Sequence, residues 1–295
     1  MTDLPDLDLL EDRLRLHVEA LASIPRPPGS AAHTLAQASI EAHFRQAGFA
    51  VTRQPFRAGG VHGVNLLTAP RPDRPALPLV VVAAHYDSIP DSPGADDNAS
   101  AVAALMELAD VLNPLLDGPG PWHARVQLAA YDQEEAGLVG SAAHAATIKV
   151  PVRGMISLEM LGYADCRPGS QHLPLHLIGL YPDVADFIGV VGNNASKPLL
   201  EEFAAGLRLV PKLPVEVLAV PGRGEELPEA RLSDHASFWD RGLPALMVTD
   251  TSFFRNPHYH RPGDLPETLD YAFLARVVAG VQTAVYRLLR AERVG

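Results

Sequence analysis

Hydrophobic residues along the chain fall into two kinds of pattern, one typical of helices and one typical of buried strands. Near the start, Leu10, Leu14, Val18 and Leu21 recur at helical spacing, and the Pro-rich segment 25–28 ends that helix. Short apolar runs predict strands at residues 49–57, 63–68, 79–84, 125–131, 155–160, 174–180, 215–220 and 244–249. Apolar residues at helical spacing predict further helices near residues 31–47, 99–112, 136–147, 183–207 and 270–292.

This order of elements predicts the fold class. Strands that alternate with helices form mostly parallel sheets with helices on both faces. We therefore expect a three-layer α/β/α fold with a mostly parallel, mixed and twisted sheet, whose early strands form an antiparallel edge. The sequence has no internal repeat, so we expect a single domain over residues 1–295. Residues 162–232, rich in Pro and Gly near both ends, are expected to place loops and a helix over the functional site.

The composition and charge of the chain disfavour several classes of protein. A chain of 295 residues with 47% hydrophobic content can bury a large core, and it has no run of eighteen uninterrupted apolar residues that would indicate a membrane partner. The net charge of −11 disfavours nucleic-acid binding, which depends on clustered Lys and Arg. The acidic N-terminus lacks a secretory pattern and Cys166 is the only cysteine, so we expect a cytoplasmic protein without disulfides. None of these features indicates an oligomeric state.

Metal-ligand residues follow the apolar run at 79–84. His85 and Asp87 come directly after it, and Asp97 follows on a Gly-Ala-Asp-Asp-Asn turn before the next helix. Ligands of open α/β sheets bind at the carboxyl ends of strands, so these three side chains are expected to meet at one sheet edge. Asp96 and Asn98, on the same turn, are better read as turn formers and helix caps.

Three later segments add donors of the same kind. Glu134 and Glu135 follow the strand at 125–131, and on an irregular turn one of them can bind metal while the other faces an attacking water. Glu159 lies inside an apolar strand, where an unpaired carboxylate is too costly unless a cation or partner is present. His260 follows the strand at 244–249, and His258 competes with it as the ligand.

Together these segments resemble the zinc-dependent aminopeptidases of metallopeptidase family twenty-eight, whose relatives include glutaminyl cyclases. The resemblance covers about residues 60–270, and its motifs occur in the family's order. The matching segments are His85-x-Asp87, Gly94-Ala95-Asp96-Asp97-Asn98-Ala99-Ser100, Asp132-x-Glu134-Glu135-Ala136-Gly137, Glu159-Met160-x-Gly162, Ser233-Asp234-His235 and Tyr259-His260.

The resemblance implies the zinc exopeptidase fold and a site for two Zn²⁺ ions. One ion would take His85 and Glu159, the other would take Glu135 and His260, and Asp97 would bridge them. The family more often has Asp at the position of Glu159. The resemblance therefore supports the metal site of His85 and Glu159 less strongly than the site of Glu135 and His260. Co²⁺ or Mn²⁺ can occupy similar nitrogen and oxygen sites.

The resemblance also implies roles for four further side chains. Glu134 would be the general base that takes a proton from the attacking water and delivers it to the leaving amine. Asp87 would orient the His85 imidazole, and the Tyr259 hydroxyl would stabilise the oxyanion. Asp234 would contact the substrate amine.

The expected activity is that of a metal-dependent exopeptidase, a hydrolase that removes N-terminal residues from peptides with a free N-terminus. Two alternatives stay open. One is a glutaminyl cyclase, suggested by His85-Tyr86-Asp87-Ser88, although the Glu-Glu-Ala-Gly run fits the peptidases better. The other is a non-catalytic domain that uses metal structurally, which is disfavoured because every matched position keeps usable chemistry.

Overall fold

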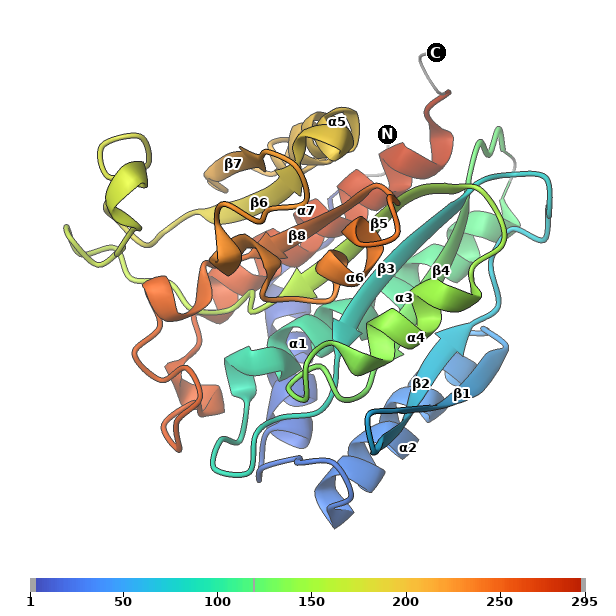
Figure 1. Ribbon diagram of the computed structural model, residues 1–295, viewed down its shortest axis with the longest axis horizontal. Coiled ribbons are helices and arrows are strands. Elements are labelled where there is room, and N and C mark those ends of the chain that lie inside the picture. Colours follow the sequence, from blue (N-terminus) through green and yellow to red (C-terminus); the bar gives the residue numbers. More distant parts are fainter. Residues whose placement is uncertain (1–3, 119, 293–295) are drawn as a thin grey trace.

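A computed structural model describes residues 4–118 and 120–292 of the chain. Eight strands form one mixed sheet in the order β1-β2-β4-β3-β5-β8-β6-β7 (Figure 1). The strands are β1 Val51–Ala58, β2 Val61–Thr68, β3 Leu79–His85, β4 Arg125–Tyr131, β5 Val152–Glu159, β6 Ile188–Asn193, β7 Val215–Val220 and β8 Ala245–Thr249. The helices are α1 Leu7–Leu21, α2 Ala31–Gln46, α3 Ala101–Asp117, α4 Val139–Thr147, α5 Lys197–Leu207, α6 His235–Trp239 and α7 Tyr271–Arg290.

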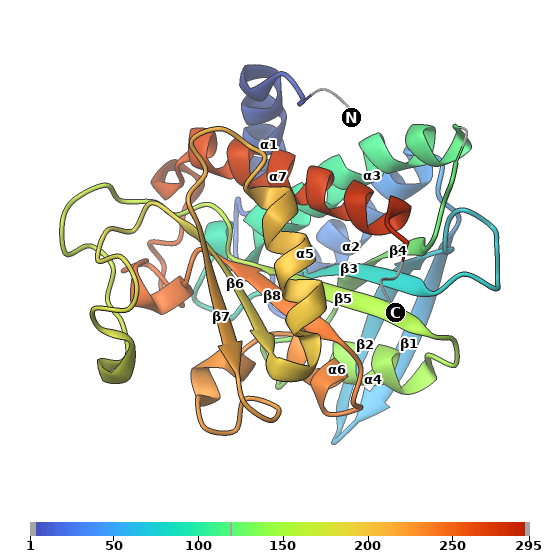
Figure 2. The ribbon, with the colours of Figure 1, turned by 90° about the horizontal axis from the view of Figure 1, so that it is seen from above.

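Helices cover both faces of the sheet, as the three-layer prediction requires. One face packs against α1, α2, α3, α5 and α7, and the other packs against α4 and α6 (Figures 1 and 2). The first helix buries the predicted stripe of Leu10, Leu14, Val18 and Leu21. The predicted fold class is therefore confirmed.

The centre of the sheet is parallel and its edges are mixed. β4, β3, β5 and β8 run parallel to one another, and β1, β2 and β4 pair antiparallel, which confirms the expected antiparallel edge. On the other side, β6 pairs antiparallel with β8 and parallel with β7. The carboxyl ends of the four central strands therefore lie at one edge, where their following loops meet.

Two sequence predictions between residues 174 and 207 were wrong. Residues 174–180 form no strand; Leu173 and Leu177 line a cavity while Leu175 and Leu180 face solvent, so the apolar residues have no sheet neighbour. The predicted helix at 183–207 is β6 followed by α5, which begins only at Lys197. The run that forms β6 contains two valines and two glycines, all poor helix formers, and it is buried between β7 and β8.

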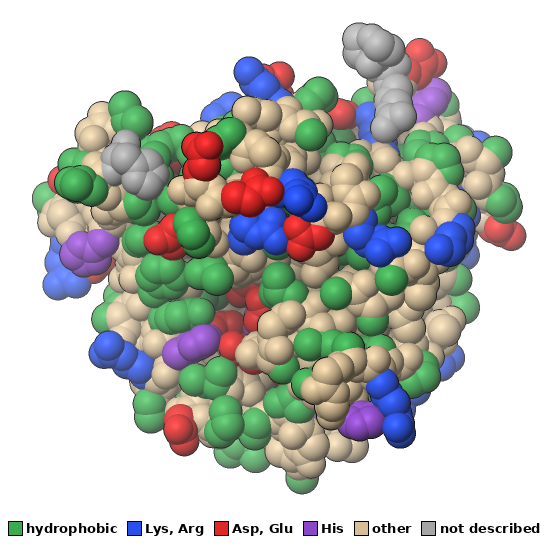
Figure 3. Space-filling view, in the orientation of Figure 1, with side chains coloured by type: hydrophobic (Ala, Val, Ile, Leu, Met, Phe, Trp, Pro, Cys, Tyr) green, Lys and Arg blue, Asp and Glu red, His purple; other side chains and the backbone are tan. Residues whose placement is uncertain are grey.

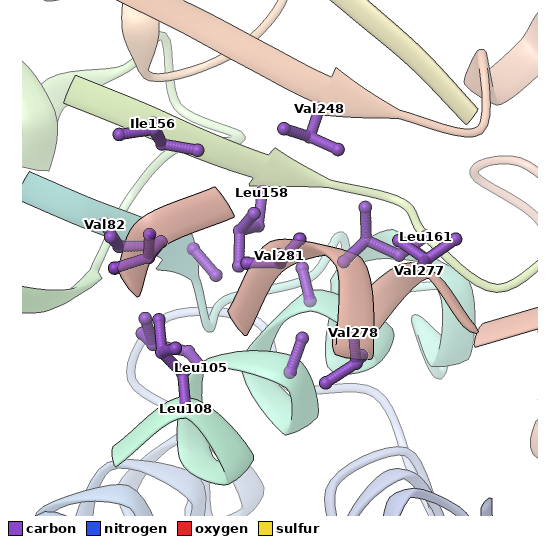
Figure 4. Packing of buried hydrophobic residues seen from close by; sticks show 14 of the residues in the cluster. Val82, Leu105, Leu108, Ile156, Leu158, Leu161, Val248, Val277, Val278 and Val281 are labelled. Atoms are coloured by element: carbon purple, nitrogen blue, oxygen red, sulfur yellow. The ribbon is translucent and has the colours of Figure 1, made fainter. Parts of the chain in front are cut away.

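The main core lies between the sheet and the larger helical layer. Figure 4 shows the strand residues Val82, Ile156, Leu158 and Val248 there, packed against Leu105 and Leu108 of α3 and Val277, Val278 and Val281 of α7. Two helical stretches, Ala95–Asp117 and Tyr271–Arg290, are long and apolar enough to cross a membrane, but 72% of each apolar window is buried inside the protein. Their hydrophobicity is accounted for by their place in this core.

The smaller layer contains a buried histidine that makes stability pH-dependent. Burial lowers the pKa of His144 to about 4, and the Tyr131 hydroxyl hydrogen-bonds its Nδ1 at 2.8 Å. Below pH about 6.5 the unfolded chain binds a proton that the folded protein does not bind, so acidification towards pH 4 favours unfolding. We expect the loss in unfolding free energy between pH 7 and pH 5 to be about 2 kcal/mol smaller in His144→Gln than in the wild type.

Urea unfolding at the two pH values measures this difference. His62→Gln is the matched control, since it makes the same chemical change at an exposed position. An equal pH dependence in His144→Gln and the wild type would contradict the assignment.

Candidate metal centre and active site

The five predicted ligands come from five separate places in the chain that meet at the carboxyl edge of the sheet. His85 ends β3 and Glu159 ends β5, while Glu135 follows β4 and His260 lies on the loop after β8. Asp97 comes from the turn between β3 and α3. In the space-filling view a hollow opens on this side of the molecule, with acidic side chains at its bottom and hydrophobic ones around it (Figure 3).

Five of these side chains form two triads that share Asp97. In the first, His85 Nε2 lies 3.3 Å from Asp97 Oδ1 and 3.4 Å from Glu159 Oε1. In the second, His260 Nε2 lies 3.1 Å from Asp97 Oδ2 and 3.1 Å from Glu135 Oε2. Each oxygen of the Asp97 carboxylate thus faces a different imidazole. The ligand atoms of each triad lie within 4.8 Å of one another, so each group can hold one metal ion.

The turn that carries Asp97 is held by Asp264 on one side and by the end of β5 on the other. The Asp264 carboxylate accepts from the backbone N–H of Asp96 at 2.8 Å and of Asp97 at 3.1 Å. Asn98 bonds both to Leu158 O and to the N–H of Met160, which ties the turn to β5. Asn98 therefore has a structural role, but its side chain ties the turn to β5 and does not cap α3, so the expected helix cap was wrong. The bonds fix the Asp97 carboxylate between the two triads.

Gly94 begins this turn at a position where only glycine fits. Its φ is +65°, and a Cβ there would lie 2.2 Å from the carbonyl oxygen of Asp97. Because only glycine fits this close approach, the turn can fold tightly enough to bring Asp97 over the end of β3.

Asp87 has a different set of contacts from the one the resemblance implies. Its carboxylate accepts from the N–H of Glu134 at 3.2 Å and of Glu135 at 3.3 Å. The His85 Nδ1 hydrogen-bonds to the Asp87 carbonyl oxygen at 3.2 Å, while the carboxylate lies 3.6 Å away. Asp87 therefore orients the imidazole through its backbone and positions the two glutamates through its side chain.

Glu134 lies beside the first triad without belonging to it. Its Oε2 is 4.0 Å from His85 Nε2, and it lines the cavity together with Glu135 and Glu159. Burial raises the pKa of Glu134 well above its usual range; His85 opposes this, and Glu159, Asp234 and Glu135 add to it. Such a group can take up a proton at neutral pH, as a general base must.

The structure places Tyr259 and Asp234 differently with respect to the cavity. Tyr259 lines the cavity and stacks on His260, with ring centroids 3.8 Å apart. Asp234 is fully buried and does not line the cavity, and among the described residues its two carboxylate oxygens have no hydrogen-bond partner. Burial raises the pKa of Asp234 to about 7.

Sequence reasoning did not single out two residues that hold ligands in place. Ser233 donates to Glu159 Oε2 at 2.7 Å and hydrogen-bonds with Ser157. These bonds fix the Glu159 side chain, which is one methylene longer than the Asp that is commoner at this position. Its place in the Ser-Asp-His motif was the available signal. Asp264, by contrast, acts across more than 160 residues of sequence.

His258, the competing ligand, belongs to neither triad.

The electrostatics of the two triads fit metal cations. Burial disfavours charge on His260, yet Asp97 and Glu135 raise its pKa to about 10. Likewise, Glu159 and Glu134 raise the pKa of His85 well above its usual range against the effect of burial. Glu135 Oε1 is buried and lacks a hydrogen-bond partner among the described residues. Crowded carboxylates, imidazoles and an unpartnered oxygen are a donor set suited to Zn²⁺.

A cavity of about 990 Å³, including its open mouth, extends from this cluster. It leads away from the ligands across β8, β6 and β7, and most of its lining is apolar. The lining includes Tyr181, Phe187, Met247, Phe253 and Phe254.

Comparison with known sequences agrees with the motifs. The family model described as Peptidase family M28 matches residues 65–285. YfbL of Escherichia coli (strain K12) is 43% identical over 223 residues, which cover 71% of this chain and 67% of YfbL. Leucine aminopeptidase 1 of Trichophyton equinum is 30% identical over 220 residues, or 70% of this chain and 54% of that protein. The match therefore spans about half the length of the fungal relative.

Solved structures with the same fold include two aminopeptidases and a cyclase. LapA aminopeptidase of Legionella pneumophila has a TM-score of 0.74 at 20% identity and covers 97% of this chain and 74% of its own. BSAP, a zinc aminopeptidase of Bacillus subtilis, has a TM-score of 0.74 at 16% identity, covering 98% and 97%. Glutaminyl cyclase of Porphyromonas gingivalis has a TM-score of 0.67 at 19% identity, covering 95% and 97%. At these identities the likeness shows the fold.

Proposed function

The chain belongs to peptidase family M28, and from this premise we propose that it is a zinc-dependent aminopeptidase with two metal ions. The observation that carries the proposal is the pair of triads that share Asp97, with Glu134 beside them. His85 and Glu159 would hold one ion, Glu135 and His260 would hold the other, and Asp97 would contact both. Bound there, zinc supplies Lewis acidity, which polarises the scissile carbonyl and acidifies water.

The protein's own residues then handle the protons. Glu134, whose pKa burial raises, takes a proton from the attacking water and delivers it to the amine that leaves. The Asp87 carboxylate keeps Glu134 in place by accepting a hydrogen bond from the backbone N–H of Glu134. Tyr259, at the cavity wall beside His260, supplies a hydroxyl that can donate to the developing oxyanion.

An aminopeptidase must also bind the free α-ammonium group of its substrate. Glu134, beside the first triad, and Glu159, a member of it, both line the cavity, and they provide negative charge where the end of the peptide would lie. Asp234 is buried behind this surface, so it contributes through the local field. A peptide with an acetylated N-terminus loses this attraction and is expected to be a poor substrate.

The test is turnover by the zinc-loaded protein on matched peptides with free and N-acetylated termini, with product masses recorded. We expect one N-terminal residue to be lost from the free peptides only, and activity to disappear with a chelator and return with Zn²⁺. Peptides that begin with Gln distinguish the alternative: a glutaminyl cyclase would release ammonia without shortening the chain. Cleavage of blocked peptides, or of none, would overturn the aminopeptidase proposal.

A further inference from the structure

The floor of the cavity is a register-matched row of residues that crosses the sheet. Glu159 on β5 pairs with Thr249 on β8, Thr249 pairs with Gly189 on β6, and Gly189 pairs with Glu216 on β7. Directly paired residues point to the same face of a sheet. All four residues line the cavity. Three strand spacings of roughly 4.8 Å put Glu216 roughly 14 Å from the metal ligand Glu159.

A second row beside the first makes the cavity apolar along its length. Met247 pairs with Val191, and Val191 pairs with Leu218, two residues along the same strands and therefore on the same face. These three residues line the cavity, as do Leu227 and Ala230 from the segment after β7. The first row has no side chain at Gly189, so the space between Thr249 and Glu216 stays open.

The far end of this cavity carries negative charge that none of the described residues neutralises with an ion pair. Glu216 and Glu229 both line the cavity, and of the described residues that line it none is Lys or Arg. Neither glutamate forms an ion pair within the described part of the chain. Other glutamates of the described residues do, such as Glu202 with Arg153 and Glu225 with Arg223.

We propose that this cavity receives the side chain of the substrate's N-terminal residue and selects Lys and Arg through Glu216, with Glu229 adding to the field. The inference rests on the proposed aminopeptidase function. Lys carries its ammonium on a flexible four-carbon stem, which suits an apolar passage that ends in a carboxylate. A Leu or Phe side chain would fill the near part and leave Glu216 partly desolvated without a partner, which is unfavourable.

Matched substrates test the selectivity. Peptides of one sequence would begin with Lys, Arg, norleucine, Leu or Glu, since norleucine has the linear stem of Lys without its charge. For the zinc-loaded wild type we expect kcat/KM to be about tenfold or more higher for Lys than for norleucine. In Glu216→Gln the ratio of the Lys to the norleucine value should fall about tenfold, while the norleucine value stays nearly unchanged. Glu229→Gln should lower the ratio less.

Glu201→Gln is the control, because it removes the same charge from an exposed position on α5 outside the cavity. It should leave the ratio unchanged. Equal hydrolysis of Lys and norleucine peptides by the wild type, or an unaltered ratio in both cavity variants, would overturn the selectivity while leaving the aminopeptidase proposal standing. A folded Glu216→Gln that loses activity on every substrate equally would also overturn it. No release from any substrate by the wild type would remove both.

Discussion

Replacing Glu134 with Gln is expected to lower kcat for peptide hydrolysis by about a thousandfold while metal binding is retained. The amide keeps the size of the side chain but cannot accept a proton from water. Glu134 is outside both triads, and the N–H that bonds to Asp87 is backbone, so the substitution should leave the ligands in place. Steady-state kinetics with metal content measured on the same sample gives both quantities.

The neighbouring Glu135→Gln is the matched control. It makes the same chemical change one residue along, but in a side chain that belongs to the second triad. It should therefore lower metal affinity, and added zinc should partly restore its activity. If Glu134→Gln were also rescued by zinc, or kept wild-type turnover, Glu134 would not be the base.

The candidate ligands could be predicted from the sequence because each lies within a short motif, and three of them end a strand or closely follow one. His85, Glu135 and Glu159 depend only on strands that run parallel, and parallel strands bring their carboxyl ends to one edge. His260 and Asp97 then follow from the family order of motifs. Local pattern was sufficient here because the chemistry requires these residue types, and chance rarely places them after successive strands.

The supports of the site could not be predicted in this way. Arg26 is fully buried, and its guanidinium donates to the backbone carbonyls of Leu21, Tyr86, Pro93 and Gly94. In the sequence it is one residue of a Pro-rich helix stop. Its bonds reach more than 60 residues away and end on backbone oxygens, which carry no sequence signal. The same holds for Asp264, which binds two backbone N–H groups.

The cavity was missed for a related reason. Glu216 lines the same cavity as the ligand Glu159 because β6 runs antiparallel to β8, which sets Gly189 beside Thr249 and Glu216 beside Gly189. The sequence prediction made residues 183–207 one helix, so β6 was absent from the expected sheet. A run of buried valines and glycines can be assigned to a strand only if its neighbours are known.

Replacing Asp97 with Asn is expected to weaken the binding of both metal ions at once, by about a hundredfold or more. Each oxygen of its carboxylate faces a different triad, whereas Glu159 and Glu135 each face one. Even side chains that only orient ligands cost about 10–100-fold in affinity when they are changed, and an amide offers one oxygen in place of two. Zinc content after dialysis against a weak chelator should be about two ions per chain in the wild type and close to none in Asp97→Asn.

Substitutions in single triads make the comparison decisive. Glu159→Gln and Glu135→Gln should each retain one ion, because the other triad keeps its His, its Glu and Asp97. The Asp97 turn should stay folded in Asp97→Asn, since its bonds to Asp264 and Leu158 come from the backbone of Asp97 and from Asn98. Retention of one tightly bound ion by Asp97→Asn would show that Asp97 serves a single metal. Loss of both ions from either single-triad variant would mean that the two sites fill only together.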